Sequence, residues 1–99
     1  MRLLLASLAL ATLAACGPIQ STAALIDADV EVEAARSAGA PSAATYEFVS
    51  AEVYLHKARE VSGRAEYESA TRLATRAQAF AKEARKKAAS TSNKDQVNP

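Results

Sequence analysis

The sequence predicts an all-α protein with a small three-helix arrangement, and three observations lead to this fold class. Alanine and other apolar residues recur every three or four positions along most of the chain, which is the period of one helix face. Glycine and proline interrupt that spacing near residues 39–41 and at residue 63, as helix ends require. The chain holds only one stretch with strand-like spacing, so a strand there would lack a partner. We therefore expect an antiparallel helical hairpin over about 43–61 and 65–89, with an additional N-terminal helix over about 22–38.

The expected first helix, over 22–38, combines an apolar stripe with an acidic alternation. The stripe consists of Leu25, Ala28, Val32 and Ala35. Gly39 followed by Pro41 is typical of a helix stop. The acidic residues that alternate with apolar ones are Asp27, Asp29, Glu31 and Glu33. Residues 27–33 therefore fit either a helix or an extended segment, and we prefer a helix. We interpret the carboxylates as a solvated face, because a helix spreads them apart whereas a hard cation needs converging oxygen ligands.

The two helices of the expected hairpin each carry one apolar face. The face of the first is formed by Ala44, Phe48, Ala51, Leu55 and Ala58. Ser42 or Thr45 is expected to cap its N-terminus, and Ser62-Gly63 to end it. The seam of the second is formed by Tyr67, Ala70, Ala74, Ala77, Ala81, Ala84 and Ala88, flanked by Leu73 and Phe80. Because alanine has little side chain, such a seam lets two helix backbones approach closely. Residues 90–99 are polar, and we expect a disordered tail there.

The N-terminus has the features of a signal peptide over residues 1–15. Met1-Arg2 supplies a positive start, and residues 3–15 are almost wholly apolar, as in a charged n-region and an h-region. The apolar run of ~13 residues is too short for a bilayer, which needs about 20. Small residues Ala14 and Ala15 then lead directly into Cys16, the single cysteine of the chain. A disulfide within the chain is therefore excluded.

Leu13-Ala14-Ala15-Cys16 resembles the bacterial lipobox, the cleavage motif of prolipoproteins. The resemblance implies cleavage between Ala15 and Cys16, a diacylglycerol on the Cys16 sulfur and acylation of the new amine in many bacteria. Two or three acyl chains anchor a protein stably, whereas one binds only marginally. The alternative is an unmodified cysteine in an uncleaved helix. Residues 16–21 would form the lipidated residue and a short tether, and Gly17 in place of aspartate favours the outer membrane by the same resemblance.

The charge balance excludes some partners and leaves one basic cluster. Removing Arg2 with the leader leaves 11 basic against 11 acidic residues, so nothing favours nucleic acid as a partner. The candidate contacts for an anionic partner are Lys82, Arg85, Lys86 and Lys87. Their position near a helix C-terminus is also explained by the helix dipole alone. An anionic lipid, peptidoglycan or an acidic protein would suit the cluster.

No catalytic residues, cofactor or metal site are predicted from the residue types. His56 is the single histidine, and a zinc site needs three or four suitable ligands. Nucleophilic catalysis needs a nucleophile, a base and an orienting group, and no such set is visible. We expect His56 at or near the surface. We expect Tyr46, Tyr54 and Tyr67 to pack at helix contacts with their hydroxyl groups facing water.

Two family resemblances cover the helical region. The motif Tyr67-x-x-Ala70-x-x-x-Ala74-x-x-Ala77, preceded by Ala58 and Val61, resembles part of a tetratricopeptide hairpin, but a single unit excludes a repeat array. A wider set is similar to the bacterial envelope family known as domain of unknown function 4398. Its marks are that motif together with Ala35-Arg36-x-x-Gly39-Ala40, Tyr46 and Ala51-Glu52-x-x-Leu55-x-x-Ala58-Arg59-Glu60. This resemblance implies an alanine-rich helical domain over 22–89 behind a lipoprotein leader, and it implies no catalytic residues.

These observations favour a lipid-anchored, non-enzymatic cell-envelope protein that acts as a spacer, scaffold or assembly adaptor. The anchor would be the acyl chains on Cys16, with the domain facing the periplasm. Alanine seams bury little apolar area in so small a domain, so partner helices or self-association would add burial. The alternative function is a periplasmic binding module for a peptide or cell-wall fragment, using the tyrosines and the basic helix end.

Overall fold

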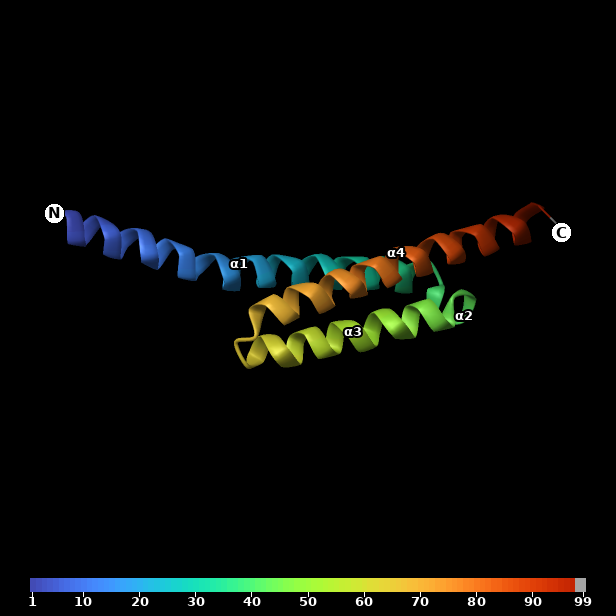
Figure 1. Ribbon diagram of the computed structural model, residues 1–99. Coiled ribbons are helices and arrows are strands. Elements are labelled where there is room, and N and C mark those ends of the chain that lie inside the picture. Colours follow the sequence, from blue (N-terminus) through green and yellow to red (C-terminus); the bar gives the residue numbers. More distant parts are fainter. Residues whose placement is uncertain (98–99) are drawn as a thin grey trace.

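The protein is an elongated bundle of α-helices (Figure 1). The computed structural model describes the backbone of residues 1–97 and the side chains of residues 1–7 and 17–94. Over residues 1–97 it has no strand, and its helices are α1 (Arg2–Ser37), α2 (Ala40–Ala43), α3 (Thr45–Gly63) and α4 (Tyr67–Val97). The predicted all-α fold is therefore confirmed, with α3 and α4 as the hairpin and α1 as the additional helix. The segment 27–33 is helical.

Helix α4 lies between the other two long helices, antiparallel to α3 and parallel to α1 (Figure 1). Two contacts between α1 and α4, Ala24 with Gln78 and Glu31 with Arg85, each join residues 54 positions apart. A constant separation of this kind means that α1 and α4 run parallel in fixed register. Helix α1 makes fewer contacts with α3 than with α4. The N-terminal part of α4 therefore lies beside the earlier residues of this stretch of α1, and the later part of α4 lies beside the later ones.

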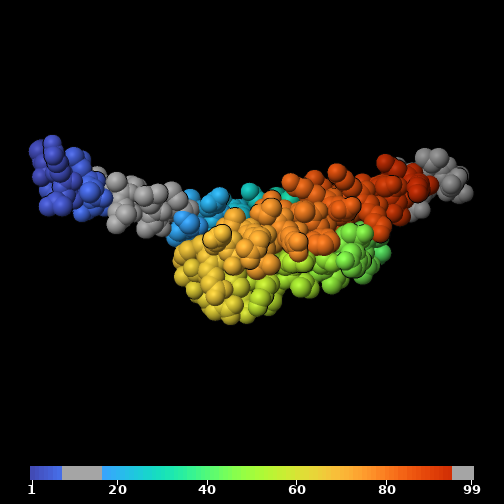
Figure 2. Space-filling model, viewed as in Figure 1, coloured from blue at the N-terminus to red at the C-terminus, as the bar shows by residue number. Residues whose placement is uncertain are grey.

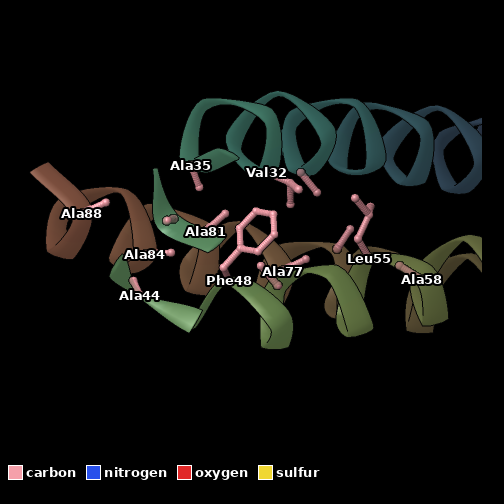
Figure 3. Close-up of a cluster of buried hydrophobic side chains, with 14 residues drawn as sticks. Val32, Ala35, Ala44, Phe48, Leu55, Ala58, Ala77, Ala81, Ala84 and Ala88 are labelled. Atoms are coloured by element: carbon pink, nitrogen blue, oxygen red, sulfur yellow. The ribbon is translucent and has the colours of Figure 1, made fainter. Parts of the chain in front are cut away.

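The core is made of alanine, with three large side chains at its centre. The seam alanines predicted for α4, Ala70 through Ala88, are buried. Val32 of α1 and Phe48 and Leu55 of α3 point into the space between the helices (Figure 3). The stripe predicted for α1 is also buried at Ala28 and Ala35. Because the alanines are short, these three side chains supply much of the apolar volume between helices that pack closely.

The helix ends follow the predicted stops, but the predicted caps are wrong. Gly39 adopts φ 86° two residues after the last residue of α1, and α3 ends at Gly63. The N-cap of α3 is Ala44, and no side-chain hydrogen bond caps that end. The Thr45 hydroxyl instead donates to the Pro41 carbonyl at 2.8 Å. Residues 40–43 already form the short helix α2, so the preceding carbonyl groups are available as acceptors and the hydroxyl turns back toward them.

Two segments that we expected to be irregular are helical. Residues 17–21, interpreted as a tether, belong to α1, with Pro18 inside the helix. Residues 90–97, interpreted as a disordered tail, continue α4. The first segment packs against α4 at Gly17, next to Tyr67. The second contains no glycine or proline, and the Thr91 hydroxyl donates to the Lys87 carbonyl at 3.0 Å. Residues 98–99 lie outside the described part.

Candidate functional site

The segment that follows Cys16 is part of the folded bundle. The side chains of Ala15 and Cys16, the predicted cleavage and lipidation residues, lie outside the described residues. At the next position, a Cβ atom added to Gly17 would lie 3.9 Å from the ring of Tyr67. A hollow of about 350 Å³ at this end of the bundle is lined by Gly17, Gln20, Tyr67, Glu68, Thr71 and Arg72. Packing of α1 against α4 is therefore already present one residue after the predicted attachment point.

Pro18 occupies an unfavourable position in the full-length chain. It lies inside α1, which begins at Arg2. A proline in a helix interior removes one backbone hydrogen bond and its ring crowds the preceding turn, at a cost of about 3 kcal/mol. The Thr22 hydroxyl donates to the Pro18 carbonyl at 2.8 Å, so that carbonyl is satisfied. The free-energy cost of Pro18 arises because the helix continues on its N-terminal side, from Arg2 onward.

The predicted basic cluster is divided by the structure into two pairs. Arg85 approaches Glu31 of α1 at 3.6 Å, and Lys87 donates to Glu47 of α3 at 3.1 Å. These two cations join α4 to its neighbours. Lys82 and Lys86 are exposed and form no ion pair with any described residue. Only this second pair is available to an anionic partner without breaking a contact between helices.

Aromatic side chains from α3 and α4 gather at the seam between these helices. Tyr54 stacks on Phe80 with ring centroids 5.5 Å apart, and Tyr46 meets Phe80 edge-on at 6.3 Å. The Arg76 guanidinium lies over the Tyr54 ring at 5.6 Å and donates to its hydroxyl group at 3.2 Å. Tyr54 and Tyr67 are partly buried, as predicted for helix contacts, but Tyr46 is 72% exposed. The cluster therefore presents aromatic surface to solvent.

A charged groove separates α1 from α3. Arg59 pairs with Asp29, and Arg36 pairs with Glu52 at 3.4 Å. A hydrogen bond from Arg36 to Glu33, with a smaller contribution from Glu52, raises the pKa of Arg36. His56 is exposed, as expected, and lines a hollow of about 240 Å³ in this groove. These ion pairs are roughly half exposed, and such pairs contribute little to stability.

The acidic residues of α1 are mostly exposed, and three of them also form ion pairs. Asp29, Glu31 and Glu33 each contact a different arginine. Asp27 is exposed. Asp29 and Glu33 remain exposed, as expected for a solvated face, whereas Glu31 is partly buried beside Arg85 of α4. Within the described residues, no group of three acidic, histidine or cysteine side chains is arranged to hold a metal ion.

An exposed apolar stripe on α1 is a feature that the sequence analysis missed. Ile19, Ile26 and Val30 are 69%, 57% and 61% exposed, and Ala23 lies on the same face by its spacing. We define these four residues as the α1 ridge. Their spacing of three and four is itself a helical signal. The sequence alone does not single out this stripe, because Pro18 favours a tether over residues 17–21 and because the opposite face of α1 is also apolar.

Comparison with known proteins identifies the family of this chain. Within the described residues, no helix is both long enough and apolar enough to cross a membrane. No curated protein and no solved structure matches the chain. The description "Domain of unknown function (DUF4398)" applies to the family that matches residues 23–98, a span that begins in α1 and covers α2, α3 and α4. The chain therefore belongs to the DUF4398 family.

Proposed function

We propose that the chain is a lipid-anchored, non-enzymatic protein of the bacterial cell envelope, a spacer, scaffold or assembly adaptor. Residues 1–15 are its signal peptide, and Cys16 carries the acyl chains. Gly17 in place of aspartate favours the outer membrane, with the domain facing the periplasm. The observation that carries the proposal is the motif Leu13-Ala14-Ala15-Cys16, placed directly before Gly17, which lies against Tyr67 of α4.

The position of Pro18 supports cleavage before Cys16. In the full-length chain, Pro18 lies inside a helix and costs about 3 kcal/mol. A chain that begins at Cys16 would have Pro18 in the first turn of α1. There a proline is favourable, because the first N–H groups of a helix have no intrahelical partner and the proline φ angle already suits a helix. Removal of the leader would therefore turn an unfavourable residue into a helix start.

The parallel register of α1 and α4 gives the anchored domain a direction. Gly17 lies beside Thr71 and Tyr67, so α4 runs away from the anchored end. At about 1.5 Å per residue, Lys82 and Lys86 lie about 17 and 22 Å further along the axis than Thr71. Such distances exceed the Debye length of about 8 Å at physiological ionic strength. A domain that stands on its anchor would present these lysines to the periplasm rather than to its own bilayer.

The proposed role as scaffold or adaptor is supported by the surfaces that the bundle leaves open. Exposed apolar residues lie on α1 and also on α3, where Val49 and Val53 are examples. Contiguous exposed apolar surface is typical of sites where other proteins bind. Spacers and scaffolds need rigid elements, and α4 is a helix of 31 residues, or roughly 46 Å.

Intact mass spectrometry of the native protein tests the anchor. We expect a chain that begins at Cys16 and carries the added mass of two or three acyl chains. The matched control is Cys16→Ser, for which neither cleavage at that site nor acyl mass is expected, and the protein should leave the membrane fraction after carbonate or high-salt washing. A wild-type chain that starts at Met1, or one with a free thiol at residue 16, would overturn the proposal.

A binding module for a peptide or cell-wall fragment is the second candidate. It is favoured by the exposed aromatic cluster around Phe80 and by the exposed Lys82 and Lys86 on the same helix. Co-sedimentation with purified peptidoglycan tests it. The double variant Lys82→Ala/Lys86→Ala should lose retention, whereas Thr75→Ala, exposed on the same helix, should retain it. If the double variant sediments with peptidoglycan as fully as Thr75→Ala does, this candidate function is wrong.

A further inference from the structure

We infer that the α1 ridge lies on the surface of the lipid bilayer that holds the acyl chains of Cys16, so that α1 runs along the membrane. The inference rests on the proposed function, since it needs the anchor at Cys16, and it adds the orientation of the anchored domain. Three features carry it. These are large apolar side chains left outside the core, a stripe that continues the line of the anchor, and a charge distribution that suits neutral lipid.

The two isoleucines of the chain lie on the ridge and not in the core. Ile19 and Ile26 are 69% and 57% exposed, and Val30 is 61% exposed. In Figure 2 the atoms of α1 (light blue to teal) lie at the edge of the bundle, beside α4 (orange). The opposite face of α1, with Ala28 and Ala35, is buried in the bundle. Large apolar residues exposed together are typical of a surface that contacts another protein or a membrane.

The ridge continues the line of the proposed anchor. Residue 16 precedes Ile19 by three positions in the same helix, and the ridge itself advances by three and four positions, so residue 16 belongs to the same stripe. From residue 16 to Val30 this stripe is about 21 Å long. Within it, a shallow and mainly apolar depression is lined by Pro18, Ile19, Thr22, Ala23 and Ile26. Acyl chains attached at residue 16 would therefore enter the bilayer on the side that the ridge faces.

The charges beside the ridge select neutral lipid. Asp27 and Asp29 flank the ridge by their spacing, and Asp29 is paired with Arg59 of α3. The first basic residue of α1 after the anchor is Arg36, which pairs with Glu33. Helices that bind membranes without an anchor usually carry lysine and arginine beside their apolar face, where these residues attract anionic lipid. The ridge lacks that attraction, so only the burial of its apolar side chains favours contact with the bilayer.

The ridge by itself is a weak membrane contact, and the anchor makes it effective. Membrane binding of an apolar helix face increases with the apolar area that it buries, and the ridge has only four apolar residues. Once the acyl chains hold the protein on the bilayer, the ridge meets lipid at a high effective concentration, so a weak contact persists. The domain then lies along the bilayer, with α4 packed against the other side of α1.

Spin labels on the native, acylated protein in phosphatidylcholine vesicles test the inference. Cys16 is the single cysteine, and acylation blocks its sulfur, so a cysteine introduced elsewhere is the one that reacts with the label. Val30→Cys reports on the ridge, and Val53→Cys on α3 is the matched control, at positions that are 61% and 60% exposed. Electron paramagnetic resonance then measures collisions of each label with oxygen, which concentrates in lipid, and with a water-soluble nickel chelate.

We expect the label at residue 30 to lie about 5–10 Å into the boundary between headgroups and acyl chains, and the label at residue 53 to stay in water. Proximity to the anchor alone would bring a label near the bilayer, so the ridge is also altered in the Val30→Cys protein. There Ile26→Asp should return the label to water, because a carboxylate in an apolar environment is costly unless it is paired. Val53→Asp, at a similarly exposed position, should leave the label immersed. Circular dichroism confirms that both variants remain helical.

Three results would overturn the inference. The first is a label at residue 30 that collides with the nickel chelate as often as the label at residue 53 does. The second is a label at residue 30 that stays immersed after Ile26→Asp. The third is protection from both reagents that grows with the number of protein molecules per vesicle, which would mean that another copy covers the ridge. Acyl mass at Cys16 is measured separately: a chain without it contradicts the proposed function as well, whereas an acylated chain with residue 30 in water contradicts this inference alone.

Discussion

The Gln78 side chain of α4 donates a hydrogen bond to the backbone carbonyl of Ala24 on α1, with the nitrogen and oxygen 3.1 Å apart. A side-chain amide reaches the backbone of a neighbouring helix only where the two helices lie close together. The buried alanines of α4, such as Ala74 and Ala81, leave room for this approach because they have no side chain beyond Cβ. The alanine seam therefore sets the distance between helices, and its substitution is the first prediction.

Replacement of a seam alanine by leucine should destabilise the fold. Ala81 is fully buried, so Ala81→Leu should reduce the free energy of unfolding by about 1–3 kcal/mol, the usual effect of overpacking. Ala89→Leu is the control, at an exposed position of the same helix, and should change it by less than about 0.5 kcal/mol. Urea denaturation followed by circular dichroism measures both. Equal stability of the two variants would contradict close packing at the seam.

Ala65→Gly should stabilise the turn between α3 and α4. Ala65 has φ 62°, in the left-handed region, where its N–H donates to the Ser62 carbonyl and the N–H of Glu66 donates to the Val61 carbonyl. This is the Schellman arrangement, in which glycine is preferred. We expect a gain of roughly 0.5–1 kcal/mol in the free energy of unfolding, since the left-handed conformation strains an alanine.

The control for that turn is Gly39→Ala. Gly39 has φ 86°, and nothing lies within 4 Å of an added Cβ atom. Any loss of stability in this variant must therefore come from the backbone conformation alone, and we expect about 1 kcal/mol. Thermal and urea denaturation of both variants should give changes of opposite sign. A destabilised Ala65→Gly would show that the turn in solution differs from the one described.

Ser21→Ala should stabilise the α1 end of the bundle. The Ser21 side chain is buried, and its hydroxyl group has no hydrogen-bond partner among the described residues. Removal of an unsatisfied buried hydroxyl group should raise the free energy of unfolding by about 1 kcal/mol. Thr22→Ala, at the adjacent exposed position, should stay within about 0.5 kcal/mol of the wild type. Loss of stability in Ser21→Ala would indicate that this hydroxyl group is satisfied in solution.

Glu47 should make stability depend on pH in the acidic range. A backbone hydrogen bond, followed by the bond from Lys87, lowers the pKa of Glu47 below its ordinary value of 4.5. A carboxyl group with a lowered pKa stabilises the fold above its ordinary pKa, and that stabilisation is lost as the pH falls through the pKa of the folded state. We therefore expect the melting temperature to fall as the pH decreases below 4.5, and to fall less steeply in Glu47→Gln.

Titration of the Glu47 carboxyl group by nuclear magnetic resonance measures this pKa directly. Lys87→Gln removes the second cause and leaves the backbone hydrogen bond. The pKa of Glu47 in that variant should therefore lie between the wild-type value and 4.5. A wild-type pKa at or above 4.5 would contradict the ion pair between α3 and α4.

The helices and their buried faces were predictable because both depend on local patterns. The spacing of Phe48, Leu55 and the seam alanines identified the faces that the structure buries. Gly39 and Gly63 marked the ends of α1 and α3. Contacts between helices were not predictable, since Arg85 with Glu31 and Lys87 with Glu47 join residues 54 and 40 positions apart. One sequence allows many pairings of that length.

The sequence by itself determined the fold class, the buried face of each helix and the resemblance of residues 13–16 to a lipobox, because helical periodicity and a short motif are properties of neighbouring residues. Only the tertiary structure decided that residues 17–21 are helical and packed rather than a tether, because Gly17 lies against Tyr67, a residue 50 positions away on another helix. It also brought Tyr46, Tyr54 and Phe80 together and left the α1 ridge uncovered. The physical reason is the same in each case: the register of α4 between α1 and α3 fixes which side chains meet, and that register is set by the packing of all three helices together.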